Sequence, residues 1–240
     1  MRPVPGLLFV VSLSGCGSGP AVPPVVPSTA SLLSVSPLPT SFPAPVSGPH
    51  TVQGDVFDAQ SGEVGTADIN LWVQQTRVGY AYWWANGRLM SNSAGHFTAP
   101  NIPDSQVTLL AVKDGFVQPC AVTADVANDR VVNVEMIATS RFDGSTSPRP
   151  VAAIGPIVNA FVFESTPEGR QPVAGASVWV ENGFEVGLAT TRSDRGGRIF
   201  LCNLPTDAFL YITKAGFTDV SKGPVDVSGA GTLEIGMTRR

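Results

Sequence analysis

Few side chains in this chain of 240 residues could carry out catalysis. Its two histidines, His50 and His96, belong to no H-x-x-E or H-E-x-x-H pattern that would hold zinc. The sequence also contains no C-x-x-C pair, no G-x-S-x-G nucleophile motif and no P-loop. Its acidic residues are scattered, and the turn at Ser193-Asp194 lacks the clustered D-x-[DN] spacing of a calcium loop. We therefore predict that the protein is not an enzyme, with no catalytic residue, no cofactor and no metal.

The first of three cysteines, Cys16, lies at the end of an export signal. Arg2 supplies a minimal positive region, and the apolar run 7–11 is too short to span a bilayer as a helix. Leu13-Ser14-Gly15-Cys16 resembles the lipobox of bacterial lipoproteins. The resemblance implies that residues 1–15 are a cleaved signal peptide and that Cys16 is lipidated, which would anchor the protein stably in a membrane. The alternative is an ordinary secretory peptide whose cysteine is incidental.

The residue after Cys16 indicates the membrane to which the protein would be anchored. Gly17 follows the cysteine, where Asp would indicate retention at the inner membrane. By analogy with lipoproteins, we therefore expect an extracytoplasmic protein anchored to a bacterial membrane, with the outer membrane favoured.

Cys120 and Cys202 remain if Cys16 is lipidated. An extracytoplasmic compartment permits a disulfide between them, but the bond requires Cα atoms within about 7 Å. Two interpretations stay open at this point: a disulfide between Cys120 and Cys202, or two separate buried thiols.

The aromatic run GYAYWWANG could bind a ligand by stacking. Alternation along a strand places Tyr80, Tyr82 and Trp84 on one face and Trp83 on the other. Flat aromatic side chains on an exposed β-surface suit stacking against sugars or peptide side chains. Packing in the core or at an interface is the alternative, and it is the more common role of such a strand.

Composition and the distribution of turn-forming residues predict the elements that must position these residues. Gly and Pro are abundant, at 25 and 21, and charged residues make up only 14%, which is typical of an all-β protein rich in turns. Residues 17–49 contain no Asp, Glu, Lys or Arg and are dense in Pro, so we expect residues 16–49 to be a disordered tether. The net charge of −4 and the absence of a basic cluster argue against nucleic acid as a partner.

The remainder of the chain contains two copies of one pattern, separated by about 100 residues. Period-two alternation in each copy indicates half-buried antiparallel strands. Corresponding segments are SNSAGHFTAPNIP (91–103) with SDRGGRIFLCNLP (193–205), and the lysine motifs at Lys113 and Lys214; Trp72 aligns with Trp179. The length of the period favours tandem domains over a solenoid.

The order of motifs in each copy resembles the carboxypeptidase regulatory-like domain, a transthyretin-like β-sandwich. The motifs are Val52-x-Gly54-x-Val56-Phe57-Asp58, Val158-x-Ala160-x-Val162-Phe163-Glu164, Ser193-Asp194-x-x-Gly197 and Lys214-x-Gly216-Phe217. The resemblance implies an all-β fold of two tandem antiparallel seven-stranded β-sandwiches, transthyretin-like or Ig-like. The expected boundaries are domain 1 at 50–138, a linker at 139–155 and domain 2 at 156–240.

These features predict a non-catalytic, lipid-anchored extracytoplasmic protein that uses its β-sandwiches as spacer and interaction modules. Its expected partners are the membrane, through the lipid anchor, and a glycan or protein ligand. The alternatives are a carbohydrate-binding module protein, or an accessory subunit of an outer-membrane receptor or enzyme.

Overall fold

The computed structural model describes residues 47–77, 80–144, 148–151, 153, 155–183, 186–227 and 231–240. For Glu63 and for residues 75–77 and 80–88 it describes the backbone only. Within these ranges the chain consists mainly of β-strands, with one short 3-10 helix, η1 (Thr139–Asp143). The predicted all-β class with antiparallel sheets is therefore confirmed. The predicted signal peptide, Cys16 and the tether up to residue 46 lie outside the described residues.

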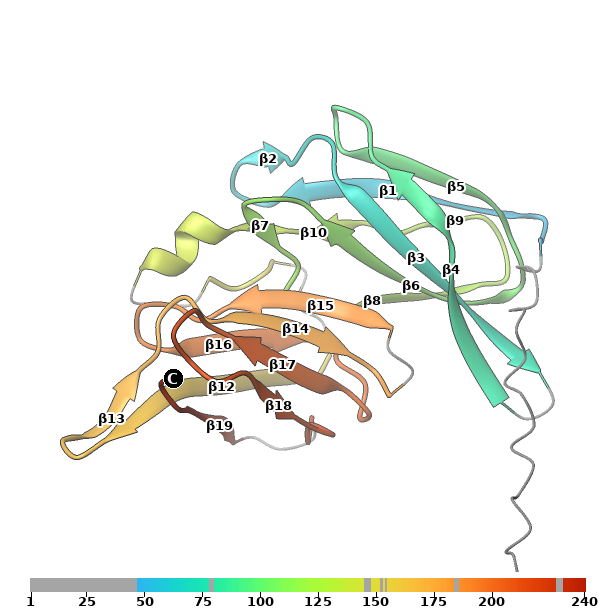
Figure 1. The fold of residues 1–240 in the computed structure, drawn as a ribbon. Coiled ribbons are helices and arrows are strands. Elements are labelled where there is room, and N and C mark those ends of the chain that lie inside the picture. Colours follow the sequence, from blue (N-terminus) through green and yellow to red (C-terminus); the bar gives the residue numbers. More distant parts are fainter. Residues whose placement is uncertain are drawn as a thin grey trace, which may run out of the picture. The chain divides into compact units, whose positions relative to one another are not determined.

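The first copy, residues 50–138, forms two main sheets (Figure 1). Its strands are β1 (His50–Asp58), β2 (Gly62–Glu63), β3 (Asp68–Arg77), β4 (Tyr80–Met90), β5 (His96–Ile102), β6 (Ser105–Val112), β7 (Phe116–Val117), β8 (Val122–Val126), β9 (Arg130–Val131), β10 (Val134–Glu135) and β11 (Ile137–Ala138). In one sheet β1 pairs with β2, β5, β9 and β10, and the other sheet has the order β4-β3-β6-β8. Apolar side chains from both sheets, including Val56, Ile69 and Phe97, form one buried core.

The second copy, residues 156–240, repeats this architecture with its own core. Its strands are β12 (Ile157–Thr166), β13 (Gly169–Pro172), β14 (Ser177–Glu181), β15 (Gly187–Arg192), β16 (Arg198–Cys202), β17 (Phe209–Thr213), β18 (Val220–Lys222) and β19 (Thr232–Met237). One sheet contains β12 with β13, β16 and β19, and the other has the order β15-β14-β17-β18. Ala121 of the first copy belongs to this second core, and Trp72 packs against it. The exact domain boundaries stay a prediction.

The corresponding segments 91–103 and 193–205 form the same turn in both copies. The side chain of Asn92 accepts hydrogen bonds from the amides of Ala94 and His96, and Asp194 accepts one from the amide of Arg198. The glycine that completes each turn has a positive φ, 83° at Gly95 and 73° at Gly197. Local sterics and side-chain to backbone bonding therefore shape the same turn twice.

The sheets are not purely antiparallel, which the sequence patterns did not predict. Strand β19 runs parallel to β12, from Asn159 opposite Thr232 to Glu164 opposite Met237. In the first copy, β9 and β10 likewise run parallel to β1. Late strands of each copy, β9 and β10 in the first and β19 in the second, thus return beside its first strand in the same direction. Alternation of apolar residues is the same in either orientation, so it could not reveal this feature.

The strand register also corrects the alignment of the two tryptophans. Trp179 lies opposite Tyr211, and Tyr211 corresponds to Leu110 through the shared lysine motif. Leu110 lies opposite Asn70, not opposite Trp72. Trp179 therefore occupies the place of Asn70, two residues away from the sequence alignment, and a shift of two keeps both tryptophans on the outer face of their sheets.

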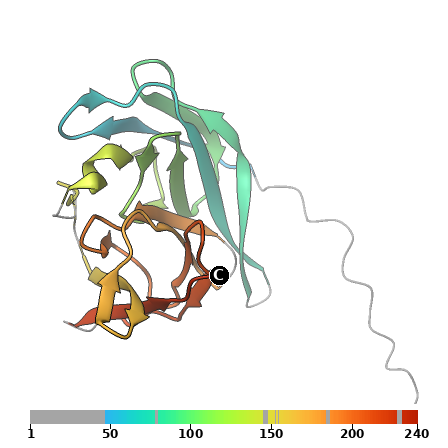
Figure 2. The ribbon, with the colours of Figure 1, turned by 60° about the vertical axis from the view of Figure 1, so that its left-hand side comes forward.

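Residues expected to be a linker contain ordered structure. Helix η1 follows β11 directly (Figure 2). Its Phe142 is buried in a cluster with Val117 and Ile137. From the same helix, Arg141 reaches Asp58 at the end of β1, with Nη2 2.5 and 2.6 Å from the two carboxylate oxygens. The start of the expected linker is therefore attached to the first copy.

Candidate functional site

The reactive side chains singled out in the sequence are not brought together. His50 pairs with Asp104 at 2.5 Å and His96 pairs with Asp55 at 3.1 Å, and these two pairs lie in different parts of the first copy. Among the described residues, no group of three or more His, Cys, Asp or Glu side chains is placed to hold a metal ion. No helix in the described ranges has the length and apolar character to cross a membrane.

The aromatic run lies in β4, the edge strand of the sheet β4-β3-β6-β8. Its backbone pairs with β3, with Tyr82 opposite Gln75 and Trp84 opposite Val73. The side chains of Tyr80, Tyr82, Trp83 and Trp84 lie outside the described atoms. Their role in ligand stacking therefore stays a prediction.

Cys120 and Cys202 meet where the two copies touch. The structure joins them by a disulfide, with Cα atoms 4.4 Å apart and a sequence separation of 82. Backbone bonds run alongside, from the amide of Cys202 to the Pro119 carbonyl at 3.1 Å and from the amide of Ala121 to the Cys202 carbonyl at 3.0 Å. This bond and the contacts around it, between residues 117–121 and residues 186–203, are called the junction below.

Gln118 supplies the polar centre of the junction and is fully buried. Its side chain accepts a bond from the Ala111 amide and donates to the carbonyls of Leu109 and Cys120. The Gln118 carbonyl accepts a hydrogen bond from the amide of Thr190 on β15 at 2.8 Å, and the Gln118 amide donates one to the Thr190 hydroxyl at 3.0 Å. Because a buried amide must satisfy its polar atoms, these partners hold the segment in one conformation. The edge strand β15 consequently lies against β6 and β7 of the first copy (Figure 1 and Figure 2).

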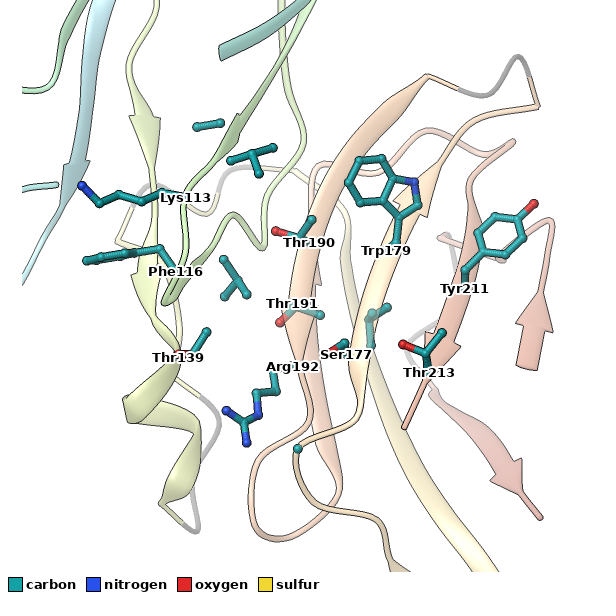
Figure 3. Close-up of a pocket in the computed structure, with 15 residues that line it drawn as sticks. Lys113, Phe116, Thr139, Ser177, Trp179, Thr190, Thr191, Arg192, Tyr211 and Thr213 are labelled. Atoms are coloured by element: carbon teal, nitrogen blue, oxygen red, sulfur yellow. The ribbon is translucent and has the colours of Figure 1, made fainter. Parts of the chain in front are cut away.

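A groove of about 520 Å³ opens beside the junction. The first copy lines it with residues 111–113, 116–117 and 139, and the second copy with residues 175, 177–179, 190–192, 211 and 213. Figure 3 shows Ser177, Trp179, Thr190, Tyr211 and Thr213 on the outer face of the sheet β15-β14-β17-β18. The groove is thus formed by one sheet face of the second copy and by the β6–β7 region of the first.

Two aromatic side chains dominate the open side of the groove. Trp179 on β14 and Tyr211 on β17 are directly paired across the strands and are 37% and 38% exposed (Figure 3). The indole ring of Trp179 packs closely over Gly187 of β15. A Cβ added at Gly187 would lie 2.7 Å from the ring and 2.9 Å from the Leu110 side chain. The indole Nε1 lies 3.4 Å from the Glu181 carboxylate. The indole ring is therefore positioned, yet more than a third of its surface stays accessible.

Arg192 makes the other end of the groove cationic, and Lys214 lies next to it in an adjoining pocket that shares Gly175, Ser177 and Thr213 with the groove. A Cβ added at Gly175 would lie 2.7 Å from Arg192 Nη2 and 3.2 Å from Lys214 Nζ, so the two positive groups lie over this glycine. The nearest carboxylate to Arg192 is Asp143, at 3.8 Å. Lys113 contributes differently, because its ammonium donates to the carbonyls of Val64 and Thr66, and only its stem lines the groove.

Sequence reasoning did not single out Trp179 and Tyr211, although a signal was present. In SVWVE (177–181) and FLYIT (209–213), each aromatic residue stands between two aliphatic residues that alternation directs into the core. The pattern therefore placed both rings on the outer face. It could not show that they lie opposite one another, which depends on strand register.

Comparison with known proteins gives little further information. No protein-family model and no curated protein matches the sequence. The chain is similar to the minor pilin GBS52 of Streptococcus agalactiae, with 14% identity over 80% of this chain and 96% of that chain and a TM-score of 0.29. It is also similar to the shaft pilin SpaA of Lactobacillus rhamnosus GG, with 8% identity over 79% and 97% and a TM-score of 0.27. TM-scores of this size carry no argument about function.

Proposed function

We propose that this protein is a non-catalytic, lipid-anchored extracytoplasmic binding module whose ligand site is the groove beside the junction. The observation that carries the proposal is the exposed pair of Trp179 and Tyr211 on a sheet face. Exposed aromatic residues that are directly opposite one another place two apolar rings side by side on the sheet surface, a platform that suits stacking against a ligand. The groove is lined by aromatic, aliphatic, hydroxyl and cationic side chains, a combination suited to holding a ligand.

The junction supports this function by making the site rigid. The groove draws its two walls from different copies, so relative motion of the copies would change its shape. A disulfide and the buried Gln118 oppose such motion. A preorganised site loses less conformational entropy when it binds a ligand. The disulfide is also the kind of bond that persists outside the cytoplasm, which supports an exported protein.

A carbohydrate is the ligand class that the platform favours over a protein partner. The C–H face of a sugar ring stacks on an aromatic ring, while Ser177 and Thr213 beside the platform supply hydroxyl groups for its polar edge. A specific protein interface buries about 800 Å² on each partner, which is more than an isolated aromatic pair provides.

Removal of the platform should abolish binding without unfolding the protein. We expect Trp179→Ala with Tyr211→Ala to lower the free energy of unfolding by only about 1–3 kcal/mol, because both side chains are partly exposed. Binding of the full chain to a glycan array should be lost, while its circular dichroism spectrum should stay that of the wild type. Unchanged array binding by a folded double variant would contradict the proposed site.

Anchoring rests on Cys16 and is tested separately. We expect a fatty-acid probe to label the wild-type protein in bacterial cells and not the Cys16→Ser variant, because the lipidated atom is the Cys16 thiol. Cys120→Ser serves as the matched control and should keep the label. Equal labelling of the Cys16→Ser variant would refute the lipid anchor and leave the groove proposal intact.

A further inference from the structure

We propose that the ligand of the groove is an acidic oligosaccharide, one whose sugar rings carry carboxylate groups. This inference rests on the proposed function and specifies its ligand class. The evidence is the arrangement of side chains in successive rows on the outer face of the sheet β15-β14-β17-β18, together with the charge at one end of these rows.

The first row is the aromatic platform. Across the three strands, Thr190, Trp179 and Tyr211 are in register, so their side chains share one face. The aromatic rings offer a stacking surface for the apolar face of a sugar. Thr190 is also bound to Gln118 of the junction, which fixes the position of β15 beside the platform.

The second row adds polar groups at the next position on the same face. Arg192, Ser177 and Thr213 are in register across the same strands, two residues along from the aromatic row. Two residues of a strand span about 7 Å, so the second row lies close enough to contact a ligand that is stacked on the first. The guanidinium of Arg192 and two hydroxyl groups therefore face the ligand beyond the aromatic platform (Figure 3).

The third element is the pair of positive charges over Gly175. Arg192 Nη2 and Lys214 Nζ both approach this glycine, and a methyl group there would collide with the guanidinium. In the part of the chain that the structure describes, Lys214 forms no ion pair. The Arg192–Asp143 separation of 3.8 Å is too long for a hydrogen bond. Two neighbouring cations with so little compensation are unfavourable alone and favour an anionic ligand.

The local charge near Gly175, from Arg192 and Lys214, is positive, whereas the net charge of the whole chain is −4. A neutral saccharide would use the aromatic row and leave Lys214 without a counter-charge and Arg192 with only the Asp143 carboxylate at 3.8 Å. A carboxylate can accept two parallel hydrogen bonds from a guanidinium, which is stronger and more directional than a neutral contact. A ligand that stacks a sugar ring on Trp179 and Tyr211 and places a carboxylate near Arg192 and Lys214 would use all three features. An oligomer of sugar acids has both groups.

Isothermal titration calorimetry of the purified full chain with three probes tests this inference. The probes are a galacturonic acid hexamer, the neutral cellohexaose, and poly-glutamate as an acidic peptide. We expect binding to the galacturonic acid hexamer to be at least about tenfold tighter than to cellohexaose, the equivalent of one charge-assisted hydrogen bond. Arg192→Gln with Lys214→Gln should remove this preference. The control is Arg170→Gln on β13, in the other sheet of the second copy. It removes one surface arginine and should retain the preference for the acidic hexamer.

The outcomes separate this inference from the proposed function. Both saccharides could bind equally well, with binding that requires Trp179 but is unchanged by the Arg192→Gln, Lys214→Gln variant. That result would overturn the acidic ligand and leave the proposed binding function intact. Binding of poly-glutamate alone would overturn the saccharide in favour of an acidic peptide. If no probe and no glycan on the array bound to the folded wild-type protein, both proposals would be wrong. Thermal melting of the Arg192→Gln, Lys214→Gln variant verifies that it is folded.

Discussion

Replacing Arg141 by alanine is expected to lower the free energy of unfolding by about 3–5 kcal/mol, because it leaves a buried carboxylate without its counter-charge. Asp58 is 1% exposed, and Arg141 Nη2 contacts both of its oxygens. The two residues lie 83 positions apart, on β1 and η1. Urea denaturation followed by tryptophan fluorescence measures the change. Arg240→Ala is the control, since its pair with Asp219 is more than half exposed and such pairs contribute at most about 1 kcal/mol.

The contribution of this pair should also depend on pH. Burial raises the pKa of the Asp58 carboxyl, but bonds from the Gln60 amide, Arg141 and Ser61, together with the charge of Arg141, outweigh burial and leave the pKa below its ordinary value of 3.8. Because the folded pKa is the lower one, the stabilisation is fully present above the unfolded pKa and is lost as pH falls through the folded pKa. The difference between wild type and Arg141→Ala should therefore be constant from about pH 6 to pH 8 and shrink below about pH 4. A constant difference down to pH 2 would contradict this assignment.

Removing the disulfide should have an effect of similar size. For a bond with a sequence separation of 82, chain entropy predicts a loss of about 4.5 kcal/mol when Cys120 and Cys202 are both replaced by alanine. The double replacement avoids a free thiol. Urea denaturation with and without dithiothreitol measures the effect, and the reductant should destabilise the wild type and leave the double variant unchanged.

Peptide mapping provides an independent measurement of the same bond. Digestion of the exported protein without reductant should yield one linked peptide that contains Cys120 and Cys202. Free thiols at both positions in protein purified from an oxidising compartment would refute the bond. They would also weaken the case for a rigid groove, because the junction would then rest mainly on Gln118 and its partners.

The sequence by itself determined the local architecture of this protein. Alternation of apolar residues predicts strands because a strand directs successive side chains to opposite faces, whatever surrounds it. The turns at Asn92 and Asp194 are also determined locally, since a side-chain oxygen and a glycine with positive φ act within five residues. The repeat then implied that the same sheets would form twice. The two main sheets of each copy are consistent with these expectations.

Only the tertiary structure decided which outward side chains are covered and which form a site. Leu110 and Tyr211 occupy equivalent positions, yet Leu110 is fully buried at the junction while Tyr211 is 38% exposed beside the groove. Nothing local distinguishes them, because burial on an outer face depends on what packs against that face. Here the packing is set by contacts between distant segments, such as Gln118 with Thr190 and Cys120 with Cys202. Period-two alternation tells inner from outer faces, whereas exposure of an outer face is a property of the assembled chain.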